Sequence, residues 1–246
     1  MNNNQATLNK LETMKLHGMS RAFRSTMESG LNHKFTSDEL LSHLVDAEWD
    51  DRNNRKFDRL VKASKFKYKA SFEEIDFGLK RNLDKNLLLR LSDCKWLRTH
   101  QNIIITGPTG VGKSFIASAL GHQACMYGFK TGYYFCAKLF KELKYRRDDR
   151  TYLTELKRMA KQTLIIFDDL GLEPFDTSTR LALLEILEDR ARCGSVIIVS
   201  QIPVIKWHDT FGDPTISDAI CDRIIHNAHR IELEGESLRK IFSSKT

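Results

Sequence analysis

The sequence between residues 107 and 114 reads Gly107-Pro108-Thr109-Gly110-Val111-Gly112-Lys113-Ser114, which fits the phosphate-loop pattern G-x-x-x-x-G-K-[ST]. A short β-branched run precedes it at 102–106, and a helical pattern opens at Phe115, so the motif has the strand and helix that its chemistry requires. Glycines let the backbone approach phosphate oxygens, and amides at the helix N-terminus attract their charge. We expect Lys113 to reach the β- and γ-phosphates and Ser114 to place its hydroxyl on Mg²⁺.

Two carboxylates follow the apolar run at 163–167, which reads as a buried strand. They emerge at the carboxyl end of that strand, beside the phosphate loop. We expect Asp168 to hold Mg²⁺, directly or through water, and Asp169 to orient and polarise the attacking water. Ser200 and Gln201 follow the next apolar run, where a polar side chain can reach the γ-phosphate or simply end a strand.

Beyond the loop, apolar runs and helical patterns alternate, which predicts an α/β fold with a parallel sheet covered by helices. The expected segments are a helix at 113–127, a strand at 131–136, a helical region at 137–160, a strand at 163–167, a helix at 178–192 and a strand at 195–199. Upstream, residues 82–97 read as one helix, and 68–78 lack periodicity and look like a linker. We therefore expect a small all-helical N-terminal domain at 1–70 and an α/β domain at 71–246.

The first 30 residues have the apolar spacing of one or two amphipathic helices, with Gly18 and Gly30 as expected breaks. Their apolar stripe either packs against the next helices or docks a partner protein. A capping-box signal between Thr36 and Glu39 begins a long helix. Basic residues then recur along it, which indicates either a solvated face or a stripe that follows a phosphate backbone; they are Arg52, Arg55, Lys56, Arg59 and Lys62.

The composition is that of a soluble globular protein, with 246 residues, 41% hydrophobic and 29% charged. No apolar run is long enough for a membrane span and no secretory signal is visible, so we expect a cytoplasmic protein without membrane partners. The net charge of +7 favours a polyanionic partner without identifying it. The five cysteines have neither disulfide-framework nor zinc-site spacing, and we expect reduced thiols in or near the core.

These motifs together resemble the AAA+ ATPases, and within them the IstB-type ATP-binding helper proteins of insertion sequences, which are similar to DnaC-type helicase loaders. The resemblance spans almost the whole chain and is carried by the stretches at 71–77, 107–114, 167–171, 200–208, 218–224 and 234–240. It implies a P-loop AAA+ three-layer α/β/α domain with a short or absent lid, and ATP and Mg²⁺ as cofactors.

The resemblance also implies roles for single residues. Gln201 takes the sensor-1 position, and Arg223 takes that of an arginine finger entering a neighbouring subunit of a homo-oligomer, so hydrolysis would depend on assembly. Arg239 is a candidate nucleotide-sensing arginine. Asp169 stands where the family usually has glutamate, one methylene longer, which predicts slow hydrolysis or hydrolysis stimulated by DNA or a partner.

The long connection at 138–161 is rich in basic residues. The initiator and loader ATPases, which this chain resembles, use an inserted helix near this position to line a DNA-binding pore. We expect phosphate contacts here, with a solvated face as the alternative, from Lys144, Arg146, Arg147 and Arg150.

The function implied is an ATPase that helps transposition: it oligomerises on target duplex DNA, remodels it, and recruits or stimulates a separate transposase. Two alternatives stay open. One is a loader of a replicative helicase acting on single-stranded DNA, and the other is a non-hydrolysing adaptor switched by nucleotide.

Overall fold

The structure is a computed structural model that describes residues 3–30, 34–191 and 193–238. Contacts divide the chain into two compact units, Met1–Arg59 and Leu60–Thr246, and the division falls inside the long helix α3 (Ser37–Ser64). This division precedes the domain boundary expected near residue 70, which stays a prediction. Each unit is described by itself.

The N-terminal unit consists of α1 (Asn3–Thr13), α2 (His17–Glu28) and the first part of α3. The predicted capping box is present, because Glu39 N donates to Thr36 Oγ1 at 3.3 Å and Thr36 N donates to Glu39 Oε2 at 2.8 Å. The predicted break at Gly18 is wrong, since the chain turns before α2, at Lys15, whose φ is 59°. Gly18 lies inside α2, where an added Cβ would be 2.2 Å from the carbonyl oxygen of Ala47, so glycine allows α2 and α3 to approach closely.

A buried carboxylate of α3 fixes that approach. Glu48 Oε2 accepts hydrogen bonds from the amides of Gly18 at 2.8 Å and Met19 at 3.2 Å, in the first turn of α2. These amides have no partner within their own helix, and the helix dipole favours a negative charge there. The contact therefore docks the N-terminus of α2 on α3.

The second unit contains a five-stranded sheet in the order β2-β3-β4-β1-β5, with every neighbouring pair parallel. Its strands are β1 (Asn102–Thr106), β2 (Thr131–Phe135), β3 (Leu164–Leu170), β4 (Ser195–Ser200) and β5 (Ala228–Glu232). The parallel sheet predicted from the alternating pattern is thus confirmed.

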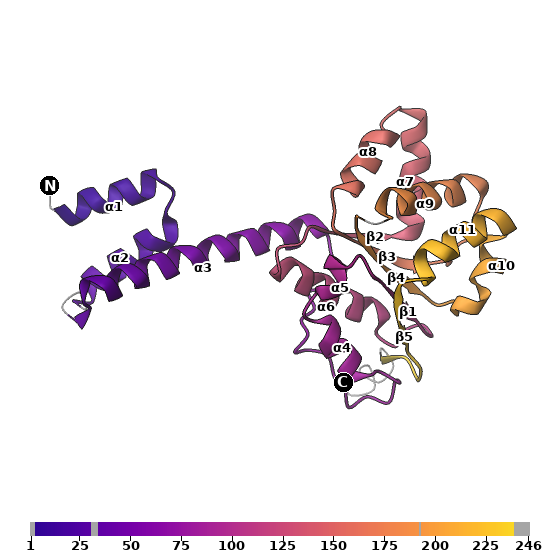
Figure 1. Ribbon diagram of the computed structural model, residues 1–246, viewed down its shortest axis with the longest axis horizontal. Coiled ribbons are helices and arrows are strands. Elements are labelled where there is room, and N and C mark those ends of the chain that lie inside the picture. The colour runs from indigo at the N-terminus through magenta and orange to yellow at the C-terminus, as the bar shows by residue number, and fades with distance from the viewer. Residues whose placement is uncertain (1–2, 31–33, 192, 239–246) are drawn as a thin grey trace. The chain divides into compact units, whose positions relative to one another are not determined.

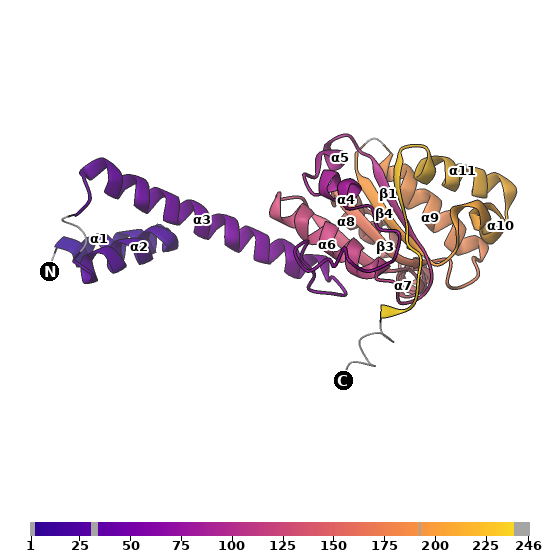
Figure 2. The same cartoon turned by 90° about the horizontal axis from the view of Figure 1, so that it is seen from below.

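Helices cover both faces of this sheet (Figures 1 and 2). On one face lie α4 (Lys85–Leu91), α5 (Lys95–Arg98) and α6 (Lys113–Met126). The other carries α7 (Cys136–Asp148), α8 (Tyr152–Ala160), α9 (Thr177–Arg190), α10 (Trp207–Phe211) and α11 (Pro214–Ile225), with a 3₁₀ turn at Val204–Lys206. Successive side chains of a strand point to opposite faces of the sheet and pack in different hydrophobic cores. In β1, Ile103 and Ile105 pack in the core on the α6 side, and Ile104 packs in the core on the α9 side. The predicted three-layer α/β/α arrangement is confirmed.

Two predictions upstream of β1 are wrong. The single helix expected at 82–97 is divided into α4 and α5, because the chain turns at Cys94, whose φ is 55°. The expected linker at 68–78 is part of the core, since Ala70 and Ile75 are buried and Phe72 packs against the α6-side core. Aromatic and aliphatic side chains bury this segment without any helical or strand period.

The cysteines are free thiols. Cys94, Cys125 and Cys136 are buried, as expected of core thiols, whereas Cys193 is exposed. Among the described residues, no helix has the length and apolar character needed to cross a membrane.

Candidate nucleotide-binding site

The phosphate loop joins the carboxyl end of β1 to the first turn of α6. Gly110 and Gly112 have φ values of 87° and 97°, which other residues rarely adopt. Lys113 Nζ donates to the carbonyl oxygens of Gly107 and Pro108, both at 2.7 Å, so its ammonium lies within the curve of the loop. Burial lowers the pKa of Lys113, and the nearby Asp169 and Asp168 counteract part of this effect. The loop thus surrounds one buried positive charge, as phosphate binding requires.

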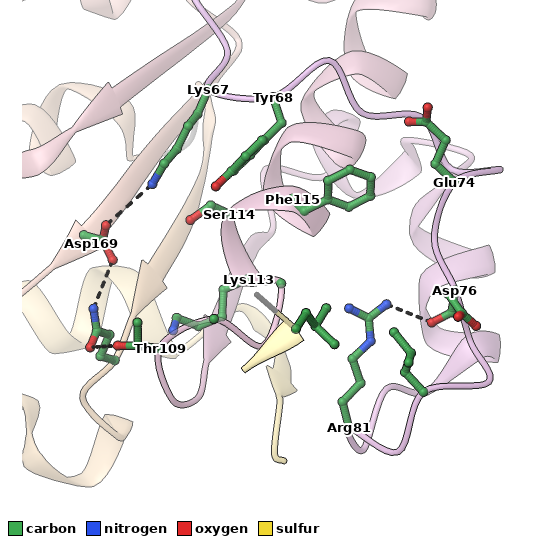
Figure 3. Close-up of a pocket in the computed structure, with 15 residues that line it drawn as sticks. Lys67, Tyr68, Glu74, Asp76, Arg81, Thr109, Lys113, Ser114, Phe115 and Asp169 are labelled. Atoms are coloured by element: carbon green, nitrogen blue, oxygen red, sulfur yellow. Dashed lines mark hydrogen bonds and ion pairs between the residues drawn. The ribbon is translucent and has the colours of Figure 1, made fainter. Parts of the chain in front are cut away.

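A cavity of about 480 Å³ opens over this loop (Figure 3), a volume in the range of ligand pockets. Its polar side is formed by Thr109, Lys113, Ser114, Asp169 and Gln201. Tyr68 and Phe115 lie between these groups and a second wall that includes Glu74, Asp76 and Arg81 (Figure 3). Leu79 and Leu238 also line the cavity. A cationic loop beside an aromatic and aliphatic wall suits a phosphorylated ligand with a planar base.

Asp168 is fully buried and makes three hydrogen bonds. Its Oδ1 accepts from Ser114 Oγ at 2.7 Å, and its Oδ2 accepts from Tyr133 Oη at 2.6 Å and Lys67 Nζ at 3.0 Å. The two predicted metal ligands, Ser114 and Asp168, are therefore in contact. Hydroxyl and carboxylate oxygens that meet beside a phosphate loop fit Mg²⁺, which binds through few protein ligands together with phosphate oxygens and water.

Asp169 has a φ of 58° and lies where the pairing of β3 with β4 shifts register, between Phe167 and Leu170. Such an irregularity changes the direction of a side chain, here near the carboxyl end of an inner strand, at a cost in backbone strain. Asp169 faces the cavity, where its Oδ1 lies 3.4 Å from Gln201 Nε2. Gln201 Oε1 in turn accepts from Thr109 Oγ1 at 2.6 Å. A chain of polar contacts thus connects the second acid to the phosphate loop.

Ser200 does not share this position with Gln201. It is buried, and its Oγ donates to the carbonyl oxygen of Leu170 at 2.7 Å, so it stabilises the β3–β4 irregularity. Of these two polar residues, only Gln201 lines the cavity.

Three residues of this region were not assigned to the site from the sequence. Tyr133 and Lys67 bind Asp168, and Arg81 lies behind the loop, where its Nη1 donates to the carbonyl oxygen of Val111 at 3.3 Å. Lys67 belongs to a basic run and Tyr133 to an apolar strand, so neither has a distinguishing sequence signal. Burial and the neighbouring Asp168 raise the pKa of Tyr133, which therefore stays a hydrogen-bond donor.

Arg223 lies in the last turn of α11. Its Nη1 donates to the carbonyl oxygen of Ala219 at 2.8 Å, and its Nη2 forms an ion pair with Glu188 of α9. Its own carbonyl oxygen accepts from Asn102 Nδ2 at 3.0 Å, at the start of β1, whereas the phosphate loop follows the end of that strand. Arg223 is thus separated from the phosphate loop of its own chain by the length of β1. Arg239 lies outside the described residues.

The residues expected to contact nucleic acid form two groups, and the structure gives several of them internal partners. On α3, Arg52 pairs with Glu48 at 2.7 Å and Arg55 with Asp51 at 2.6 Å. Lys56, Arg59 and Lys62 follow on the same helix, and no ion pair involves them among the described residues.

The second group is on α7 and in the turn before α8. Lys144 pairs with Asp176 at 3.4 Å, and the guanidinium of Arg147 stacks 4.6 Å from the ring centroid of Tyr152. Arg146 Nη1 donates to Thr151 Oγ1 at 3.3 Å. Arg150 lies in the turn with a φ of 61°. This surface is basic, but several of its cationic side chains already interact with other residues of the protein. Phosphate contact by either group stays a prediction.

This chain is similar to known proteins in sequence and in fold. The model of the IstB-like ATP binding protein family matches residues 9–246. The insertion sequence ATP-binding protein y4pL of Sinorhizobium fredii is 43% identical over 95% of this chain and 96% of its own length. The insertion sequence IS1162 ATP-binding protein of Pseudomonas fluorescens is 38% identical over 81% of this chain and 87% of its own.

Among solved structures, DnaI has a TM-score of 0.59 at 19% identity, covering 72% of this chain and 93% of that one. The replication initiator DnaA bound to AMPPCP and single-stranded DNA has a TM-score of 0.56 at 17% identity, covering 74% of this chain and 55% of that one. At such identities the likeness concerns the fold alone, and it confirms the predicted AAA+ architecture.

Proposed function

Because the chain belongs to the IstB-like ATP-binding protein family, we propose that it is an Mg²⁺-dependent ATPase that helps transposition by assembling on target duplex DNA. In this proposal the protein remodels the DNA and recruits or stimulates a separate transposase. The observation that carries the enzymatic part is the convergence of Lys113, Ser114, Asp169 and Gln201 on a single cavity, with the buried Asp168 hydrogen-bonded to Ser114.

Binding of ATP would use the loop and the wall beyond it. Lys113 exchanges its carbonyl partners at Gly107 and Pro108 for phosphate oxygens, while the amides at the start of α6 contribute further donors. Ser114 and Asp168 hold Mg²⁺, which neutralises charge on the phosphates when bound. Tyr68 and Phe115 offer aromatic surface to the adenine base.

Hydrolysis would rest on Asp169, which orients a water and accepts hydrogen bonding from it. Gln201 keeps this carboxylate beside the γ-phosphate position through its contacts to Asp169 and Thr109. Aspartate reaches less far than the glutamate usual in AAA+ proteins, so we infer slow turnover that DNA or a partner accelerates. Arg223 would supply positive charge to the site of the adjacent subunit.

DNA binding would depend mainly on backbone phosphates. The helical N-terminal domain proposed at 1–70 presents Lys56, Arg59 and Lys62, and the ATPase domain proposed at 71–246 adds the basic end of α7. Binding of this kind weakens steeply with salt and has little base specificity.

Electron microscopy of the protein with duplex DNA and a slowly hydrolysed ATP analogue tests the proposal. We expect ordered oligomers on duplex that disappear without nucleotide and in Arg223→Ala. Nucleotide binding by Arg223→Ala, measured separately, should be retained. Only monomers under all conditions would refute ATP-gated assembly, and assembly on single strands alone would favour a helicase loader.

A further inference from the structure

Lys67 brings a positive charge to the two acids of the nucleotide site. Its Nζ lies 3.0 Å from Asp168 Oδ2. It also lies 3.8 Å from Asp169 Oδ2, the contact drawn in Figure 3. Lys67 thus forms an ion pair with each of the two acids, and its bond to Asp168 has the length of a normal hydrogen bond. The ammonium is therefore a stable part of the site in the nucleotide-free protein.

The main chain that carries Lys67 is anchored by Ser64 and Phe66 before it and by the buried Ala70 after it. Before it, Ser64 ends α3 and donates through Oγ to the carbonyl oxygen of Thr131 at 2.8 Å. Phe66 packs with its ring centroid 4.5 Å from that of His122 on α6. These contacts fix the main chain and leave the long side chain, which is 35% exposed, as the part that can move.

Hydrogen bonds from neutral groups also reach the two acids, but their ion pairs involve one residue. Within 3–30, 34–191 and 193–238, Lys67 is the only cationic side chain in an ion pair with Asp168 or Asp169. Lys113 instead donates to the loop carbonyls. Two adjacent carboxylates, one of them fully buried, require a cation nearby, because unpaired buried charge is costly.

We propose that Lys67 is a positioning residue that occupies the cation position beside Asp168 and Asp169 and yields it to Mg²⁺ only when the metal arrives with nucleotide. Free Mg²⁺ would have to displace the ammonium without offering it a new partner. Nucleotide brings phosphate oxygens into the same cavity, which Lys67 also lines, so the displaced ammonium can bind them. In this way, binding of Mg²⁺ beside Asp168 and Asp169 would require bound nucleotide. This inference rests on the proposed metal site.

Binding of Mn²⁺ to the nucleotide-free protein, followed by the loss of the free Mn²⁺ electron paramagnetic resonance signal, tests the proposal. Lys67→Met removes the competing charge, and we expect it to bind Mn²⁺ about tenfold more tightly than the wild type, because the metal no longer competes with an ammonium for the two carboxylates. Lys67→Arg keeps the charge and should bind like the wild type. Asp168→Asn in the Lys67→Met background should abolish the gain.

Lys69→Met is the matched control, since Lys69 is an exposed residue of the same segment and makes no ion pair within the described residues. A Lys67→Met protein that binds Mn²⁺ no more tightly than the wild type, or no more tightly than Lys69→Met, overturns the inference. Circular dichroism verifies folding, and Lys67→Gln replaces any variant that does not fold. ATP binding by the wild type is measured in parallel: its absence would refute the proposed function, whereas the Mn²⁺ comparison decides the role of Lys67.

Discussion

Replacing Glu188, the ion-pair partner of Arg223, should favour assembly of the protein into oligomers. Arg223 pairs with Glu188, and the two side chains are 29% and 53% exposed. If Arg223 contacts nucleotide in a neighbouring subunit, it must first leave this ion pair. Partly exposed pairs contribute about 0.2–1 kcal/mol, so Glu188→Gln should favour each subunit contact by at most about 1 kcal/mol, or roughly fivefold in association constant.

Sedimentation velocity over a protein dilution series, with duplex DNA and a slowly hydrolysed ATP analogue, measures this effect as a lower concentration of half-assembly. Asp189→Asn is the control, because Asp189 is an exposed acid of the same helix with no ion pair in the described part of the chain. Weaker assembly of Glu188→Gln than of Asp189→Asn would refute the reasoning, since it would mean that Glu188 holds Arg223 in its active position. Equal assembly would show that leaving the pair costs nothing.

Three further predictions concern hydrolysis, DNA binding and the N-terminal unit. Asp169→Asn should retain ATP affinity in equilibrium binding while steady-state phosphate release falls about 10²–10⁴-fold; unchanged release would make Asp169 structural. Alanine at all of Lys144, Arg146, Arg147 and Arg150 should weaken duplex binding and reduce the slope of log K against log salt by about 0.9 for each phosphate that the protein no longer neutralises, whereas an unchanged slope would exclude this surface. Gly18→Ala should destabilise the N-terminal unit by about 1–3 kcal/mol in denaturant unfolding, because the new methyl group meets the backbone of α3; wild-type stability would contradict that packing.

The nucleotide site and the sheet were predictable because the same short stretches carry both geometry and chemistry. The phosphate loop needs a strand before it and a helix after it, so recognising residues 107–114 also places β1 and α6. Likewise, an apolar run ending in Asp168 and Asp169 predicts both a buried strand and a pair of carboxylates at its carboxyl end. The same residues therefore predicted both the local secondary structure and the position of the nucleotide site.

Features that depend on contacts distant in sequence were not predictable in this way. Gly18 was expected to break a helix on propensity alone, but close approach to Ala47 is the reason for glycine there. The segment at 68–78 was expected to be a linker because it lacks a period, yet its apolar side chains are buried on the sheet. Lys67 lies 101 residues before Asp168, and nothing in its neighbourhood distinguishes it from Lys65 or Lys69.

The position of Lys67 bears on how a change of nucleotide would be transmitted. The residue lies shortly after the end of α3, the helix that runs out of the N-terminal unit, so the proposed release from Asp168 would occur soon after the chain enters the second unit. Because Ser64 and Phe66 anchor the main chain before Lys67 and Ala70 is buried after it, exchange of the partner of Lys67 would move an ammonium without moving the end of α3. We therefore expect nucleotide to alter the charge presented beside Phe135, whose ring lies 5.9 Å from Lys67 Nζ, more than it alters the backbone of residues 60–68. Amide hydrogen exchange should show similar protection of that segment with and without nucleotide, and strong deprotection on nucleotide binding would contradict this anchoring.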